Sequence, residues 1–258
     1  SMGGAGVGLP TGAISALWGN PALMTHLGYL TFETGTEFFK DDLSSTSVTA
    51  EGVSRTTHSD GEVGVLPGVG WVLRPKGEKF ALGWGLMAAA GFRTNWAPDP
   101  QNLMLAPMWP QNGFGLLNTE LAMTKVPFAA AYQVTPKLSI GLAALVFHGR
   151  LAISPNPVNE PDISGTVAGG DFRSIRPMVG GPVTEFGLGA QIGIYYEVSP
   201  MISAGASFTT PQNFDFYEWN SVHGNPDLDN YLTARKVDID VDGPPVLSVG
   251  IGLNPTSK

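Results

Sequence analysis

The chain has 258 residues, of which only 14% are charged, against about 25% in ordinary soluble domains. The formal net charge of −8 leaves no basic stripe for phosphates, so we expect no nucleic-acid partner. The sequence has no Cys, which excludes disulfides, thiolate zinc sites and cysteine nucleophiles. No apolar run approaches the ~20 residues of a membrane helix.

The start of the chain predicts a compact segment before the first strand. Residues 1–27 are glycine-rich and do not alternate, and a short helix is predicted over residues 13–18. Such a segment is suited to packing inside a barrel. No signal peptide is visible and Ser1-Met2 resembles a cloning remnant, so we expect an export leader to have been removed.

The same segment carries a family resemblance. The runs MGGAGVG (residues 2–8) and GNPALMTHLG (residues 19–28), followed by amphipathic strands, resemble the start of the FadL family. These proteins are outer-membrane channels for long-chain fatty acids and for hydrocarbons such as toluene. Asn20, Pro21 and Ala22 match the Asn-Pro-Ala motif of the family's plug, although an ordinary Asn-Pro turn is the other interpretation.

The resemblance implies an all-β fold, an antiparallel transmembrane β-barrel in the bacterial outer membrane. Residues 1–27 would be the plug, and residues 28–258 the barrel strands with long extracellular loops. We expect contact with membrane lipid, a monomer, and neither cofactor nor metal. About ten strands are countable against fourteen in the family, and Thr256–Lys258 does not resemble an aromatic-ended last strand, so we expect truncation at the C terminus.

The first strands alternate between large apolar and small or polar residues. Tyr29–Phe38 is the first predicted strand, and the polar residues 40–60 are predicted to be a hairpin end in water. From Val63 to Leu73 the odd positions are apolar. Pro67 falls on that face and predicts a bulge or a local loss of pairing.

A break in the next strand is a candidate for an opening in the barrel wall. From Phe80 to Ala88 the even positions are apolar, and the pattern fails over residues 88–91. In the FadL family the third strand has a kink that leaves a lateral opening toward the lipid. The resemblance places this opening at Ala90, Gly91 and Phe92, although a plain bulge is also consistent with the pattern.

Residues 93–118 form a long apolar segment without strand periodicity, interrupted by four prolines. Loops longer than ~12–15 residues tend to be functional or disordered. We interpret this loop as a surface that captures apolar ligands, the counterpart of the family's external groove, whereas the alternative is a lid over the protein's own core. The candidate capture residues are Trp96, Leu103, Met104, Leu105, Met108 and Trp109.

Two basic residues are candidates for contact with a ligand carboxylate. Lys125 falls on the inner parity of its strand, and Arg150 lies near the far end of the next. Both can equally pair with acids in the lumen or meet solvent at a rim. Fatty-acid transporters of the family hold the carboxylate with basic side chains, which have no match at the corresponding residues 152–155, so an uncharged hydrocarbon remains open as the substrate.

The remaining chain continues the strand pattern. Residues 154–182 predict a second long extramembrane loop, and Val183–Phe208 predicts a hairpin. One face of this hairpin is large and apolar and the other is mostly Gly and Ser, which suits a barrel with lipid outside and also fits a soluble sandwich. The aromatic group at residues 214–219 suits an interfacial girdle, with a sugar-binding platform as the competing interpretation.

The function that these patterns favour is transport. The four His residues have no nucleophile or ligand at a diagnostic spacing, so we expect no enzyme. We expect a passive outer-membrane channel for a hydrophobic small-molecule substrate, with loop capture, plug movement and lateral exit near Gly91. The alternative is a soluble β-sandwich that binds glycans or protein partners.

Overall fold

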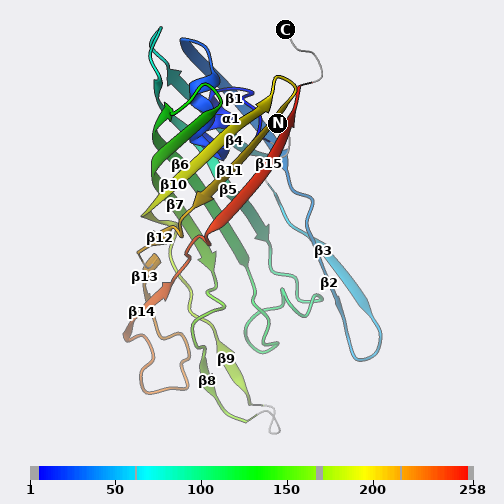
Figure 1. Ribbon diagram of the computed structural model, residues 1–258. Coiled ribbons are helices and arrows are strands. Elements are labelled where there is room, and N and C mark those ends of the chain that lie inside the picture. The colour runs from blue at the N-terminus through cyan, green and yellow to red at the C-terminus, as the bar shows by residue number, and fades with distance from the viewer. Residues whose placement is uncertain (1–5, 62, 167–170, 216, 255–258) are drawn as a thin grey trace.

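The computed structural model describes residues 6–61, 63–166, 171–215 and 217–254. Its main feature is an open antiparallel sheet that curves into a half-barrel, with β1 and β15 at its edges (Figure 1). The strands in spatial order are β1 (Leu30–Lys40), β4 (Val63–Leu73), β5 (Phe80–Trp96), β6 (Leu117–Gln133), β7 (Leu138–Ser154), β10 (Val183–Ser199), β11 (Ile202–Thr209) and β15 (Val246–Leu253). The short β12 (Asn213–Phe214) also pairs with β10.

This architecture confirms the predicted barrel-type fold. The main sheet has nine strands, where about ten were expected. The alternative of two packed sheets in a soluble sandwich is not realised, because the described strands of the barrel wall belong to one continuous sheet. Residues 1–5, Phe216 and Thr256–Lys258, which the sequence predictions used, lie outside the described residues.

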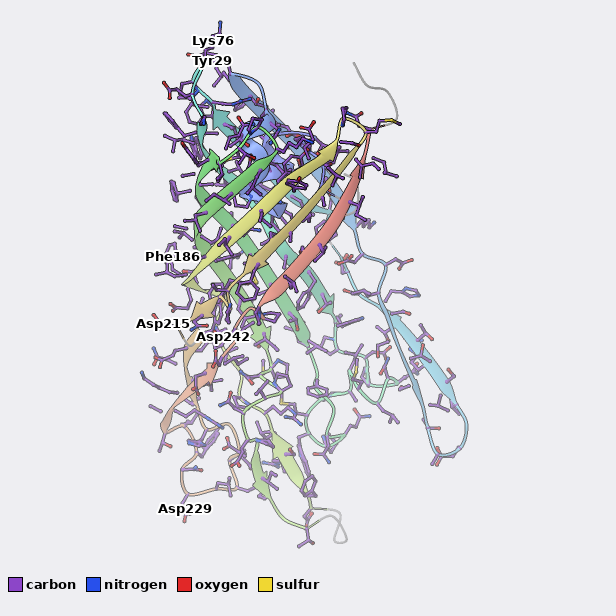
Figure 2. The ribbon with its side chains drawn as sticks, viewed as in Figure 1. Tyr29, Lys76, Phe186, Asp215, Asp229 and Asp242 are labelled. Atoms are coloured by element: carbon purple, nitrogen blue, oxygen red, sulfur yellow. The ribbon has the colours of Figure 1, made fainter. Side chains whose placement is uncertain are left out.

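The two ends of the sheet carry different connections. Three hairpins extend from one end, and the tight turns lie at the other (Figure 1). The hairpins are β2 (Ser44–Val48) with β3 (Ser54–His58), β8 (Asp162–Ser164) with β9 (Arg173–Ile175), and β13 (Tyr217–Val222) with β14 (Ala234–Ile239). Figure 2 labels Tyr29 and Lys76 at the turn end and Asp229 in the opposite loops.

The N-terminal plug lies on the inner face of the sheet. It consists of α1 (Ala13–Gly19) followed directly by the 3₁₀ helix η1 (Pro21–His26). The predicted helix is confirmed, whereas the expected Asn-Pro turn is the start of η1. Pro21 suits the first helical position because its missing N–H would have no partner there. Among the described residues, no helix is both long and apolar enough to cross a membrane.

The two faces of the sheet differ as the alternation predicts. Large apolar side chains project outward into the surroundings, and Phe186 is 64% exposed. Others on this face are Leu82, Trp84, Leu142, Leu188, Ile192, Ile194, Leu247, Val249 and Ile251. Inner residues such as Leu145 and Phe147 instead join Leu17 and Leu23 of the plug in the main apolar core. An outward apolar face over a filled interior is typical of a membrane barrel.

Glycines on the inner face let the plug backbone touch the strands. A Cβ at Gly141 in β7 would overlap the backbone of Pro21 and Ala22. Other close pairs are Gly193 with Asn20 and Gly205 with Val7. Because protein interiors have few voids, a larger residue at these positions would displace the plug. The small face that the sequence shows is therefore a seat for the plug.

Three sequence predictions need correction. Trp96 lies within β5 and not in a loop, so the loop predicted over 93–118 spans 97–116. Loop 155–182 contains the hairpin β8–β9. The aromatic group after residue 213 is not an outward girdle, since Phe214, Tyr217 and Trp219 are buried. These rings fill the interior, where Phe214 stacks on Tyr217 with a 6.4 Å separation of ring centroids.

We predict that Gly141→Val displaces the plug while the sheet still forms. A Met24→Cys reporter places a single thiol at a fully buried plug position, because the chain has no Cys. In outer membranes the reporter should be protected from a small maleimide, and it should react several-fold faster with Gly141→Val added. Gly180→Val, at a position with open space around its Cβ, is the control. Equal protection in all three proteins would contradict the close seat.

Candidate functional site

Asn20 links the plug to the barrel wall. Its buried side chain donates from Nδ2 to the carbonyl oxygens of Val7 and of Ile194 in β10, both at 2.9 Å. Its Oδ1 accepts from the backbone nitrogen of Ala22 at 3.1 Å. An amide has two donor hydrogens, and both are used here. An Asp at this position would lose both donations, so the amide itself is required.

Three strands supply side chains to the last carbonyl groups of α1. Lys125 Nζ in β6 donates to the Trp18 oxygen at 3.1 Å, and Ser207 Oγ in β11 donates to the Gly19 oxygen at 2.5 Å. Gln191 Nε2 in β10 donates to both oxygens at 3.2 Å. The final carbonyls of a helix lack partners within the helix and attract positive charge. We call Lys125, Gln191 and Ser207 the plug latch.

Lys125 has the inner position that the sequence predicts, but the plug occupies it. Its Nζ lies 4.8 Å from the centroid of the Trp18 ring, a cation–π distance, and the residue is buried. None of its described hydrogen bonds or ion pairs involves a carboxylate. Lys125 therefore contacts the plug, and it pairs with no acidic side chain among the described residues of the barrel strands.

Arg150 faces away from the interior. It lies on the same face of β7 as the exposed Ile140 and Leu142, and it forms an ion pair with Glu120 of β6. Its position does not support contact with a ligand inside the barrel. The structure instead has the alternative arrangement, in which Arg150 pairs with an acidic residue, Glu120.

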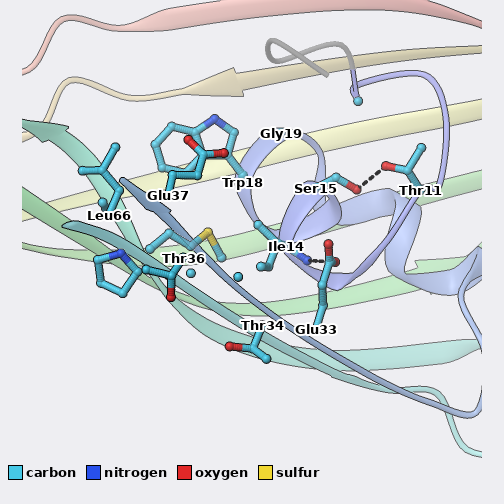
Figure 3. A pocket seen from close by; sticks show the side chains of 16 residues that line it. Thr11, Ile14, Ser15, Trp18, Gly19, Glu33, Thr34, Thr36, Glu37 and Leu66 are labelled. Carbon is cyan, nitrogen blue, oxygen red and sulfur yellow. Dashed lines mark hydrogen bonds between the residues drawn. The ribbon is translucent and has the colours of Figure 1, made fainter. Parts of the chain in front are cut away.

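A cavity of about 730 Å³ lies between the plug and strands β1, β4 and β5 (Figure 3). This volume is within the range of about 300–1,000 Å³ for small-molecule sites. The larger apolar side chains that line it are Ile14, Trp18, Leu66, Pro67 and Met87. β1 contributes Glu33, whose Oε2 accepts from Ile14 N at 2.9 Å, and Glu37.

β4 and β5 separate beside this cavity. Their register runs from Leu73–Leu82 to Gly68–Met87, after which β4 pairs only with β1, and β5 only with β6. The loss of pairing begins at Pro67, as predicted, because proline has no N–H to donate. β5 also bulges against β6 between Ala88 and Ala90. The irregularity is therefore centred on residue 89, slightly before the Gly91 of the prediction.

A second cavity of about 240 Å³ occupies this separation. The predicted opening residues Ala90, Gly91 and Phe92 all line it. Leu66, Pro67 and Ala88 line both this cavity and the larger one beside the plug. The two spaces therefore adjoin, and together they lead from the plug to the gap between β4 and β5.

The predicted capture residues do not form one surface. Leu103 is 52% exposed and Trp109 is 38% exposed. Met104 and Met108 are partly buried, and Leu105 is fully buried. Trp96 belongs to β5. Part of loop 97–116 thus covers its own interior, which was the alternative interpretation, and only its exposed side chains can receive a ligand from water.

Asp99 fixes this loop to the β2–β3 hairpin. Its Oδ2 accepts from Arg55 Nε at 2.7 Å and from Thr57 Oγ1 at 2.8 Å, and its Oδ1 accepts from Gln101 N at 3.0 Å. The hydrogen bond from Arg55, then those from Thr57 and Gln101, lower the pKa of the Asp99 carboxyl. Asp99 is not among the site residues predicted from the sequence, although an Asp flanked by prolines, with an N–H two residues later, is a turn signal.

Further contacts join the loops at two places. Arg173 lies over the Trp109 ring at 4.4 Å from its centroid, and Arg176 lies over Phe114 at 5.0 Å, so loop 155–182 touches loop 97–116. Buried Asp162 accepts from the Gly224 backbone at 2.8 Å and lies 2.7 Å from His223 Nδ1. This second contact joins β8 to the segment after β13. Within the described residues, no group of three His, Asp or Glu side chains could hold a metal ion.

The fold and the site together define a class of protein. A curved antiparallel sheet with an apolar outer face, a plug on its inner face and long loops at one end is an outer-membrane β-barrel protein. The family model described as "Outer membrane protein transport protein (OMPP1/FadL/TodX)" matches residues 2–251, and the chain belongs to this family. The predicted FadL-type fold and bacterial outer-membrane location are thereby confirmed.

Solved structures show the same fold. The Ralstonia pickettii toluene transporter TbuX is 22% identical to this chain, with a TM-score of 0.71. The P. putida toluene transporter TodX is 18% identical, with a TM-score of 0.67. A Pseudomonas aeruginosa FadL homologue is 14% identical, with a TM-score of 0.66. The alignments cover 99%, 92% and 98% of this chain, and 66%, 61% and 65% of those proteins, so the chain spans about two thirds of their length. A search of curated proteins finds no match.

We predict that Gln191→Leu loosens the plug. The change removes two hydrogen bonds, each worth roughly 0.5–1.5 kcal/mol, and about 1.4 kcal/mol is a tenfold change in an equilibrium. Labelling of the Met24→Cys reporter should therefore rise by about tenfold. Gln133→Leu, at the half-buried last residue of β6, removes a hydrogen bond to the Pro136 oxygen in the turn and should leave the rate unchanged. If both variants label at the parent rate, the latch does not hold the plug.

Proposed function

We propose that the chain is a passive outer-membrane channel for hydrophobic small molecules. The adjoining cavities carry the proposal, because an apolar molecule beside the plug meets a gap in the wall where β4 and β5 do not pair. Family membership supports transport across the outer membrane. The resemblance in fold to toluene transporters supports a hydrocarbon as one class of substrate.

The path begins at the external loops. Leu103 and Trp109 present apolar surface to water, and the cation–π contact with Arg173 holds the Trp109 ring in place. An apolar molecule gains roughly 25 cal/mol per Å² of its surface that leaves water, so such side chains favour capture without a specific shape.

The plug controls the next step. Movement of the segment Asn20–Ala22 must break the bonds of Asn20 and of the plug latch before the interior opens fully. The ligand then occupies the cavity beside Trp18 and leaves through the gap near Ala90 and Gly91 into the lipid. Each stage moves the ligand toward an apolar environment, so a concentration gradient is a sufficient driving force and no nucleotide is required.

We predict that capture depends on the exposed side chains of loop 97–116. Leu103→Ser with Trp109→Ser should weaken binding of a fluorescent apolar probe by several-fold, because apolar contact area is lost. Leu105→Ser is not a suitable test, since Leu105 is fully buried and its loss would disturb the fold. Val158→Ser, exposed in loop 155–182, is the control. Unchanged probe affinity in the double variant would remove this loop from the path.

We predict that deletion of Ala89 blocks lateral exit. Ala89 is the extra residue of the bulge, so its removal lets β5 run regularly against β6 and narrows the gap beside β4. Uptake of radiolabelled toluene by cells expressing the full-length protein should fall toward that of cells without it. Ala89→Val keeps the residue count and should retain most of the uptake. Full uptake after the deletion would place the exit elsewhere.

A further inference from the structure

The cavity beside the plug combines an apolar wall with negative charge. Of the described residues that line it, two are acidic, Glu33 and Glu37, and none is basic. Figure 3 shows both side chains among those that surround the space. Glu33 contacts the plug, because its carboxylate accepts a hydrogen bond from the Ile14 nitrogen. The side chain of Glu37 is exposed and has no hydrogen bond or ion pair with any described residue, so its carboxylate can meet a ligand that enters the cavity.

The neighbouring cation does not line this cavity. Lys125 is absent from the lining, and its Nζ is held between the Trp18 carbonyl and the Trp18 ring. A carboxylate entering the cavity would lose hydration against apolar side chains and would meet a like charge. An uncharged aromatic or aliphatic ligand incurs neither penalty, and it gains contact with Trp18 and Met87.

We propose that Glu37 makes this cavity a charge filter, which admits uncharged apolar ligands and rejects organic carboxylates. This proposal rests on the proposed function, since it assigns the ligand class of the same path. Glu33 adds to the negative potential, but it also holds α1. Glu37 is therefore the residue whose replacement separates charge from structure.

The test compares two ligands of similar shape, p-xylene and p-toluate, in which a carboxylate replaces one methyl group. Radiolabelled uptake is measured in a porin-deficient Gram-negative host that expresses the full-length protein. Equilibrium dialysis of the purified protein in detergent measures binding of both ligands independently of transport. The variants are Glu37→Gln and Glu37→Lys. Glu51→Lys makes the same charge change at the tip of the β2–β3 hairpin, which extends away from the sheet (Figure 1) and does not line the cavity.

The parent should bind and take up p-xylene, with p-toluate at background. Glu37→Gln should raise binding and uptake of p-toluate several-fold, and Glu37→Lys should raise them further, while p-xylene changes by less than a factor of two. Glu51→Lys should match the parent. Equal binding of both ligands by the parent, or an unchanged preference in Glu37→Lys, would overturn the filter. Failure of p-xylene uptake alone would overturn the channel, and dialysis would still decide the preference.

Discussion

A polypeptide in a bilayer must pair its own backbone polar groups, because lipid offers none, and this constraint governs the whole sheet. Seven strand junctions connect β1 to β15 in register, and most are continuous along the shared length. The junction of β4 with β5 is the exception, since it stops at Gly68–Met87. Unpaired backbone inside a membrane is tolerated where it lines a cavity. The gap between β4 and β5 therefore suits the exit that we propose for apolar molecules.

The plug sets a second constraint, which explains the glycine content of the inner face. Filling a narrow barrel with a backbone segment requires strands that lack side chains where the segment passes, and Gly141 and Gly193 provide such contacts. Asn20 and the plug latch then satisfy the polar groups that the plug buries. Leu17 and Leu23 of the plug also pack in the main apolar core, so movement of the plug would expose apolar surface as well as break these hydrogen bonds.

The sequence predicted the parts of this structure that depend on local pattern. Alternation identified the outward face, and Pro67 identified the loss of pairing, because each follows from the chemistry of single residues. The buried positions of Leu105 and Tyr217 were not predictable in this way, because the residue type alone does not show whether a side chain beyond the barrel strands points to water or to the interior. The partners of Lys125 and Asp99 depend on segments distant in the sequence, which periodicity does not report.

The distribution of charge links selectivity to the position of the plug. With the plug seated, Lys125 donates to the carbonyl of Trp18, whereas the side chain of Glu37 faces the cavity with no partner among the described residues. A carboxylate could pair with Lys125 only by displacing that carbonyl and by passing Trp18, so it would have to compete with a bond that is already made. A neutral hydrocarbon meets no such competition. In the filter that we propose, the contacts of Lys125 with the seated plug thus keep its ammonium group out of contact with ligands, and the carboxylate of Glu37 disfavours organic carboxylates.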